Sequence, residues 1–227
     1  QRQMCIRDSS YCYQTSWGAT TRMIGALIMV HSDDFGLVLP PKIAPVKANI
    51  IKIGDSDIVN NKIAELEETL TAKGISYVVD DSDRSPGFKF AEAEVKGIPV
   101  RIEVGERDLK ENKIVLARRD TREKITTEAD SDVASTVASL LATIQNDMYE
   151  RALERREKLT FEAHNLDDIK KIMDTQPGFV KAMWCGDEEC ELKMKEIKGT
   201  KSRCILEDAE KIDDKCVVCG KKAKHLV

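Results

Sequence analysis

Long hydrophobic runs are missing from this 227-residue sequence. Its longest uncharged apolar stretch runs from Met23 to Val30, far short of the roughly 20 residues that a membrane-spanning helix needs. The N-terminus also lacks a long apolar segment before a small-residue cleavage site, so no secretory signal is visible. We therefore expect a cytoplasmic protein without a membrane partner.

Neither sign of charge is in large excess, since 36 basic and 40 acidic side chains give a formal net charge of 36 − 40 = −4. Apolar residues make up 41% of the chain and charged residues 33%, a composition too apolar for intrinsic disorder. Aromatic residues are scarce, at 5%, so a small domain in this chain gains from an added cross-link such as a metal. The length suits one large domain or two small ones.

Cysteine is present seven times, an odd number that favours metal binding over a disulfide framework in a cytoplasmic composition. Two short pairs stand close to the end of the chain: Cys185 with Cys190, and Cys216 with Cys219. Two such pairs deliver four thiolates to a tetrahedral zinc ion, which leaves no open position and makes the metal structural. The alternative is four unmetallated core cysteines. Cys204 lies in an apolar strand pattern, so we expect a packed side chain there.

The first twelve residues need separate treatment. Residues 4–8 match the translation of a transposon adapter used in sequencing libraries, so we expect residues 1–12 to be foreign sequence. The alternative is a flexible natural terminus.

Apolar periodicity divides the remainder into segments 13–45, 46–158 and 159–227. The first reads as a short strand, a turn at Gly18, a helix and a proline-containing linker. The second alternates strands with helices, which predicts an α/β domain with a mixed sheet of about five strands flanked by helices and followed by a long helix. Its strand at 98–104 alternates, so Arg101 and Glu103 share the face opposite the apolar one. The third segment predicts a small α+β domain that carries the cysteine pairs.

Hydroxyls and a glycine precede the first helix, from Thr15 to Thr20, and Arg22 stands early in that helix. A helix N-terminus with free amides and a guanidinium suits a phosphate group. Taken alone, this pattern favours a capped surface helix with an exposed arginine.

Three sets of motifs together resemble one family. Residues 14–27 and 31–41 look like the third class II signature of prolyl-tRNA synthetases and the linker after it, with Ser32 and Phe35 where the family usually has Gly and Arg. Residues 85–90 and 97–105 resemble that family's anticodon-binding domain. Residues 184–186 and the Cys216 turn resemble the zinc-bearing C-terminal domain of its archaeal and eukaryotic-type branch, although a terminal tyrosine of the family is absent after Val227.

The resemblance implies a fragment of an enzyme that joins proline to tRNA(Pro) through a prolyl-adenylate, with ATP and Mg²⁺. It implies a homodimer through catalytic sequence upstream, and it makes segment 13–45 a remnant of the class II catalytic domain. By carry-over, Arg22 binds the γ-phosphate, Thr20 contacts the nucleotide, and the floor of the substrate pocket is formed by Thr15, Ser16, Trp17 and Gly18. Such charge-assisted contacts orient ATP.

The same resemblance assigns anticodon binding to Glu94, Arg101 and Lys124. Arginine donates in a fork to guanine, and glutamate accepts from a base amino group. Without the resemblance, solvated surface charge is the favoured interpretation of all three. A local basic patch for tRNA is expected from five side chains: Lys89, Arg101, Arg107, Arg118 and Arg119.

Two other hypotheses stay open. Glycyl- and threonyl-tRNA synthetases share the third signature and the anticodon fold, but their pattern does not resemble the four-cysteine domain. A non-catalytic zinc-containing tRNA- or RNA-binding protein is the alternative from another class. The upstream reading frame distinguishes it, because such a protein would lack the first two class II signatures.

Overall fold

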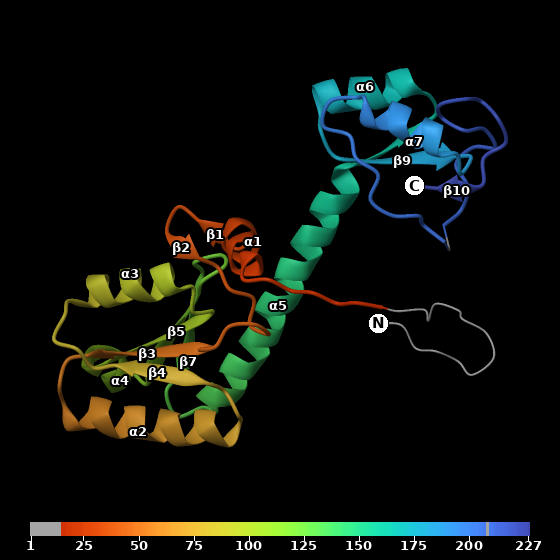
Figure 1. Ribbon diagram of the computed structural model, residues 1–227. Coiled ribbons are helices and arrows are strands. Elements are labelled where there is room, and N and C mark those ends of the chain that lie inside the picture. Colours follow the sequence, from red (N-terminus) through yellow and green to blue (C-terminus); the bar gives the residue numbers. More distant parts are fainter. Residues whose placement is uncertain (1–14, 208) are drawn as a thin grey trace, which may run out of the picture. The chain divides into compact units, whose positions relative to one another are not determined.

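The computed structural model describes residues 15–207 and 209–227, in two compact units that divide between residues 146 and 147 (Figure 1). The expected foreign segment, residues 1–12, lies outside the described residues. The division falls inside the long helix α5 (Val133–Lys158), whereas the sequence pattern starts the last segment at residue 159. Segment 13–45, as far as it is described, belongs to the same unit as the α/β domain.

A five-stranded mixed sheet forms the first unit, in the order β4-β3-β5-β6-β7. The strands are β3 (Ala48–Ile53), β4 (Tyr77–Asp80), β5 (Val100–Gly105), β6 (Lys113–Arg118) and β7 (Lys124–Glu128). The first three are parallel, and β6 and β7 continue the sheet antiparallel. The mixed sheet of about five strands is therefore confirmed, although β7 and the short helix α4 (Glu106–Lys110) have no counterpart among the elements expected from the sequence.

Helices α2 (Asp57–Ala72) and α3 (Pro86–Lys96) lie on opposite faces of this sheet (Figure 1). Apolar residues at positions 58, 59, 63, 66 and 70 predict α2. Four of them, Val59, Ile63, Leu66 and Leu70, form its buried face, whereas Ile58 is 50% exposed. The first half of α5 likewise buries the stripe from Val133 to Ile144. Burial of these periodic faces supplies most of the helices' stability, as expected for amphipathic segments.

All six residues of strand β5 are buried, including those on the face opposite the apolar one. Arg101 and Glu103 share one face, as predicted, but they are only 8% and 6% exposed. The reason is α3, which covers that face and brings Glu94 to Arg101. The interpretation of Arg101 favoured without the family resemblance, a solvated surface charge, is therefore wrong.

The N-terminal part of the first unit holds α1 (Arg22–Val30) and a small hairpin of β1 (Ser32–Asp33) and β2 (Gly36–Leu37). The strand expected before Gly18 is not seen from residue 15 onward, where the chain has no regular structure until α1. None of the residues of α1 is buried. A linker is expected over residues 32–45; its first part, residues 32–37, forms a hairpin that contacts α3, and residues 38–45 have no regular secondary structure.

In the second unit, β8 (Thr160–Ala163) and β9 (Phe179–Trp184) are parallel, joined by α6 (Leu166–Thr175), and β10 (His225–Leu226) pairs antiparallel with β9. Helix α7 (Glu188–Lys195) completes the unit. Its core contains Ala163, Ile169, Ala182, Met194 and Val217. The sequence pattern predicts a helix over residues 166–173, observed as α6, and a strand over residues 179–184, observed as β9, but it predicts neither β8 nor α7. Among the described residues, no helix is long and apolar enough to cross a membrane.

Candidate RNA-contact cluster and metal centre

Four charged side chains and one aromatic ring meet between α3 and the sheet of the first unit. Arg101 on β5 donates from Nη1 to Oε1 of Glu94 at 3.1 Å and from Nε to Oε1 of Glu103 at 3.0 Å. Its guanidinium lies 4.3 Å from the centre of the Phe90 ring. Lys124 on β7 donates to Oε2 of Glu103 at 3.0 Å and lies 5.3 Å from the same ring. We call these five residues the α3–β5 cluster.

The structure brings together the three predicted anticodon residues: strand register aligns Arg101 with Lys124, and α3 carries Glu94 to Arg101. Arg101 pairs with Ala117 on β6, and Ala117 pairs with Lys124 on β7, so the two cations lie in one cross-strand row, on strands separated by β6. The small side chain of Ala117 stands between them, so nothing bulky separates the two cations.

The cluster is formally neutral, with two carboxylates and two cations, and its members differ in exposure. Arg101 and Glu103 are buried, Glu94 is partly exposed, and Lys124 is the most exposed of the four. The hollow beside them measures only about 10 Å³, too small for a buried ligand. The arrangement therefore suits contact with the edge of a base rather than its enclosure. Phe90 and Glu103 were not among the predicted site residues; the Phe90 ring is part of the 85–90 motif, and Glu103 follows from the alternation of β5.

The expected basic patch does not form. Lys89 is buried and donates to the carbonyls of Lys52 and Asp80. Arg118 and Arg119 are also buried, each bound to an aspartate. These three side chains make hydrogen bonds and ion pairs inside the first unit. Of the five expected basic residues only Arg107 is exposed.

The candidate ATP-binding and substrate-pocket residues are not enclosed by other parts of the described structure. Thr15, Ser16, Trp17, Gly18, Thr20 and Arg22 are all exposed, and Trp17 is 95% exposed. The structure brings none of the other described candidates to them. A pocket for ATP or proline is therefore not assembled by the described residues alone.

Four thiols meet in the second unit: Cys185, Cys190, Cys216 and Cys219 have sulfur atoms within 4.8 Å of one another. The Sγ atoms of Cys185 and Cys190 are 3.7 Å apart, and those of Cys219 and Cys185 are 3.8 Å apart. Sulfur ligands about 2.3 Å from a tetrahedral zinc ion lie about 3.8 Å from each other. The donor set and its spacing therefore fit zinc.

Local structure explains both cysteine spacings. Cys216 and Cys219 occupy a tight turn closed by the Gly220 amide, which donates to the Cys216 carbonyl at 3.0 Å. Cys185 follows the last residue of β9, and Cys190 lies on α7, so the helix start accounts for the longer spacing of that pair. The turn is tied to β9 because the Val217 amide donates to the Met183 carbonyl at 2.9 Å.

The thiols differ in their electrostatics. Burial raises the pKa of Cys190. Burial also acts to raise the pKa of Cys216, but backbone amides of Cys219, Val218 and Cys185 that donate to its sulfur lower that pKa to about 7. Sulfur that accepts several amide donors is prepared for the thiolate state that metal binding requires.

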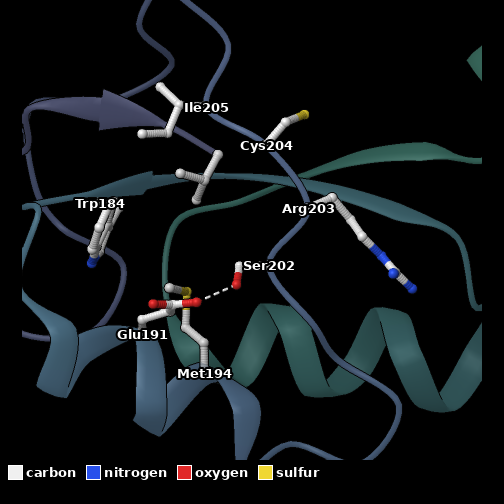
Figure 2. Close-up of a pocket in the computed structure, with 8 residues that line it drawn as sticks. Trp184, Glu191, Met194, Ser202, Arg203, Cys204 and Ile205 are labelled. Carbon is white, nitrogen blue, oxygen red and sulfur yellow. Dashed lines mark hydrogen bonds between the residues drawn. The ribbon is translucent and has the colours of Figure 1, made fainter. Parts of the chain in front are cut away.

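Cys204 stands outside this group. It is exposed and lies in no strand, so the expectation of a packed side chain is wrong. It borders a hollow of about 220 Å³ lined also by Trp184, Glu191, Met194, Ser202, Arg203, Ile205 and Val227. Figure 2 shows the Cys204 thiol and the Arg203 guanidinium directed away from Trp184 and Met194, while Glu191 accepts a hydrogen bond from Ser202.

Comparison with known proteins gives two family matches, to "Anticodon binding domain" over residues 42–140 and to "Prolyl-tRNA synthetase, C-terminal" over residues 166–227. The chain belongs to the prolyl-tRNA synthetase family, as its C-terminal region. It is 51% identical to the proline–tRNA ligases of Clostridium novyi and of Lachnospira eligens over 218 residues, which is 96% of this chain. The resemblance inferred from the motifs is confirmed.

A solved structure of prolyl-tRNA synthetase from Cryptosporidium parvum, complexed with L-proline and AMP, is 34% identical, with a TM-score of 0.80 over 91% of this chain. The chain spans 45% of the length of that protein and of both bacterial ligases.

Proposed function

We propose that this chain is the tRNA-recognising part of a proline–tRNA ligase and that its α3–β5 cluster contacts the anticodon. The observation that carries the proposal is the convergence of Glu94, Arg101 and Lys124 around the Phe90 ring. The match of residues 42–140 to an anticodon-binding family supports the same role for this unit.

The chemistry of the cluster suits an unpaired base. Lys124 is the exposed cation and donates to acceptors on a base, while Glu94 accepts from an amino group. Arg101 is held by two carboxylates and a ring, so it presents a fixed donor rather than a mobile one. Fixed donors discriminate between bases because a wrong base leaves them unpaired.

The sharpest test compares two lysines. Lys124 and Lys113 each have side chains 52% exposed and each bind one glutamate, but only Lys124 belongs to the cluster. We expect Lys124→Ala to lower affinity for an RNA hairpin with the proline anticodon by about 5- to 100-fold, the worth of one base contact. Lys113→Ala should change affinity little.

The readout is fluorescence anisotropy at fixed salt, with the proline anticodon hairpin and the same hairpin carrying substituted anticodon bases. Lys124→Ala should remove preference for the proline anticodon, whereas loss of a phosphate contact lowers affinity for all hairpins alike. Equal binding of both hairpins by the unsubstituted chain would refute the proposal.

We also propose that the four thiolates hold one structural zinc ion. When bound, zinc supplies a closed tetrahedral cross-link and takes no part in the ligation chemistry. The residues Cys185, Cys190, Cys216 and Cys219 would hold it, joining the end of β9, helix α7 and the Cys216 turn. About one zinc per chain by elemental analysis, retained in Cys204→Ser and lost in Cys216→Ser, is the expected result.

For the full-length parent we propose proline, ATP with Mg²⁺ and tRNA(Pro) as substrates, the cytoplasm as its compartment, and a homodimer formed through catalytic sequence upstream. In this proposal Arg22 and Thr20 contact ATP, and residues 15–18 line the substrate pocket. All are exposed here, in keeping with a site that needs further sequence. The 227-residue chain should therefore show no proline-dependent ATP–pyrophosphate exchange, while a longer chain with the other two class II signatures should.

A further inference from the structure

The hairpin of β1 and β2 is fitted closely to the C-terminal end of α3. Gly36 has a φ of +136°, and a Cβ there would lie 2.4 Å from Cα of Val95 and 2.8 Å from the carbonyl oxygen of Glu94. A Cβ at Gly97, which ends α3 in the left-handed conformation, would lie 2.5 Å from Cβ of Leu37. Both positions need glycine, because backbone meets backbone across this contact.

A buried arginine also binds the hairpin. Arg119, 3% exposed, donates from both Nη atoms to the Asp33 carboxylate, at 2.8 and 2.6 Å. Arg122 adds an exposed layer, with its guanidinium 3.3 Å from the centre of the Phe35 ring and 3.4 Å from Asp33. Two-point contact between a guanidinium and a carboxylate fixes orientation as well as distance.

The same arginine reaches the α3–β5 cluster. Nε of Arg119 donates to the Glu94 carbonyl at 3.0 Å, the same oxygen that the Gly36 backbone approaches. The Glu94 side chain in turn accepts from Arg101. The Glu94 peptide, which carries the carboxylate, is therefore both in close contact with the hairpin and hydrogen-bonded to Arg119.

We propose that Asp33 and Arg119 are positioning residues for base selection: they hold the Glu94 peptide so that its carboxylate is placed for the base edge. This inference rests on the proposed anticodon contact. It goes beyond that contact because it gives both residues a role that needs no contact with the RNA. It also makes the hairpin after α1 a component of the recognition site.

The test is Asp33→Asn, which keeps the shape of the side chain and removes its charge. The matched control is Asp55→Asn, since Asp55 is also an aspartate bound to a cation, Lys52, on the surface of the same unit. Binding of the proline anticodon hairpin and of its base-substituted version is measured for both variants and for Lys124→Ala. We expect Asp33→Asn to lower the ratio of the two affinities by about fivefold or more, with affinity for the substituted hairpin unchanged. Asp33→Glu, which restores the charge, should recover part of the ratio.

A merely structural role would lower the melting temperature and leave the affinity ratio of the folded protein intact, so that result overturns the inference. Lys124→Ala separates the two proposals: a ratio lost in Lys124→Ala but kept in Asp33→Asn refutes the positioning role alone. Equal binding of the two hairpins by the unsubstituted chain refutes both. Should Asp33→Asn not fold, Arg122→Asn loosens the hairpin without exposing a buried charge, because asparagine tolerates the φ of 62° at this position. Retention of the full ratio in that variant counts against the inference.

Discussion

Arg101→Ala should destabilise the first unit much more than Lys124→Ala, although both remove a cation from the same cluster. Arg101 is buried and bound to two carboxylates, so its removal leaves the buried Glu103 with Lys124 as its remaining partner and leaves Glu94 unpaired. Breaking a buried ion pair from one side costs about 3 to 5 kcal/mol.

Two features of the structure reduce that cost. Lys124 still neutralises Glu103, and Glu94 is partly exposed, so water solvates its carboxylate. We therefore expect a loss of about 2 to 3 kcal/mol in the free energy of unfolding for Arg101→Ala. Lys124 is half exposed, and loss of such a surface pair costs at most about 1 kcal/mol.

The assay is urea unfolding followed by far-UV circular dichroism, with tryptophan emission recorded in parallel. Trp17 is almost fully exposed and Trp184 lies in the second unit, so a change in emission reports the second unit. A transition seen by dichroism but not by emission reports the first. A free energy of unfolding for Arg101→Ala within about 0.5 kcal/mol of that for Lys124→Ala would refute the reasoning, since the two sites would then be equally solvated. The result also decides which variant reports RNA recognition cleanly, and we expect it to be Lys124→Ala.

Three further predictions follow from other parts of the chain. Chelator treatment or Cys216→Ser should lower the urea midpoint seen by Trp184 emission and leave the unfolding of the first unit unchanged. Cys204→Ser, at an exposed position, should change neither transition. An unchanged midpoint in Cys216→Ser would contradict the metal centre. Hydrogen bonds from Arg119 hold the pKa of Asp33 well below its usual range. The contribution of Asp33 to the free energy of unfolding is therefore present above about pH 4 and is lost as the pH falls further. The difference in free energy of unfolding between the unsubstituted chain and Asp33→Asn, measured by urea unfolding, should disappear on acidification and not on raising the pH. Gly36→Ala should lower the free energy of unfolding by about 1 to 3 kcal/mol, because the added Cβ meets backbone atoms of α3. Gly18→Ala, where a Cβ has nothing within 4 Å, should leave it unchanged. Equal effects of the two substitutions would show that the hairpin contact is loose.

Local patterns in the sequence were sufficient to predict most helices and the central strands. The stripe in α2, the glycine that ends α3 and the stripe in α5 each specify one element through spacing alone, because one face must be buried. Several short elements were not predicted. Strands β7 and β8 have too few apolar residues to show a period, and α7 is a charged helix that begins at its Asp187 N-cap. The motifs that carry chemistry were also visible, as the cysteine pairs and the 85–105 segment.

Only tertiary structure decided the environment of those residues. Alternation placed Arg101 and Glu103 on one face, but it did not show that α3 covers that face. The sequence suggested a basic patch, yet Lys89 and Arg119 turn inward to a carbonyl and an aspartate far away in the sequence, and Arg118 is buried against Asp120, two residues along the chain. A sequence pattern reports what each segment must bury, whereas the partner that buries it is set by contacts between distant segments. That is why the four thiols were predictable as a group, and why the contact of Asp33 with Arg119 was not.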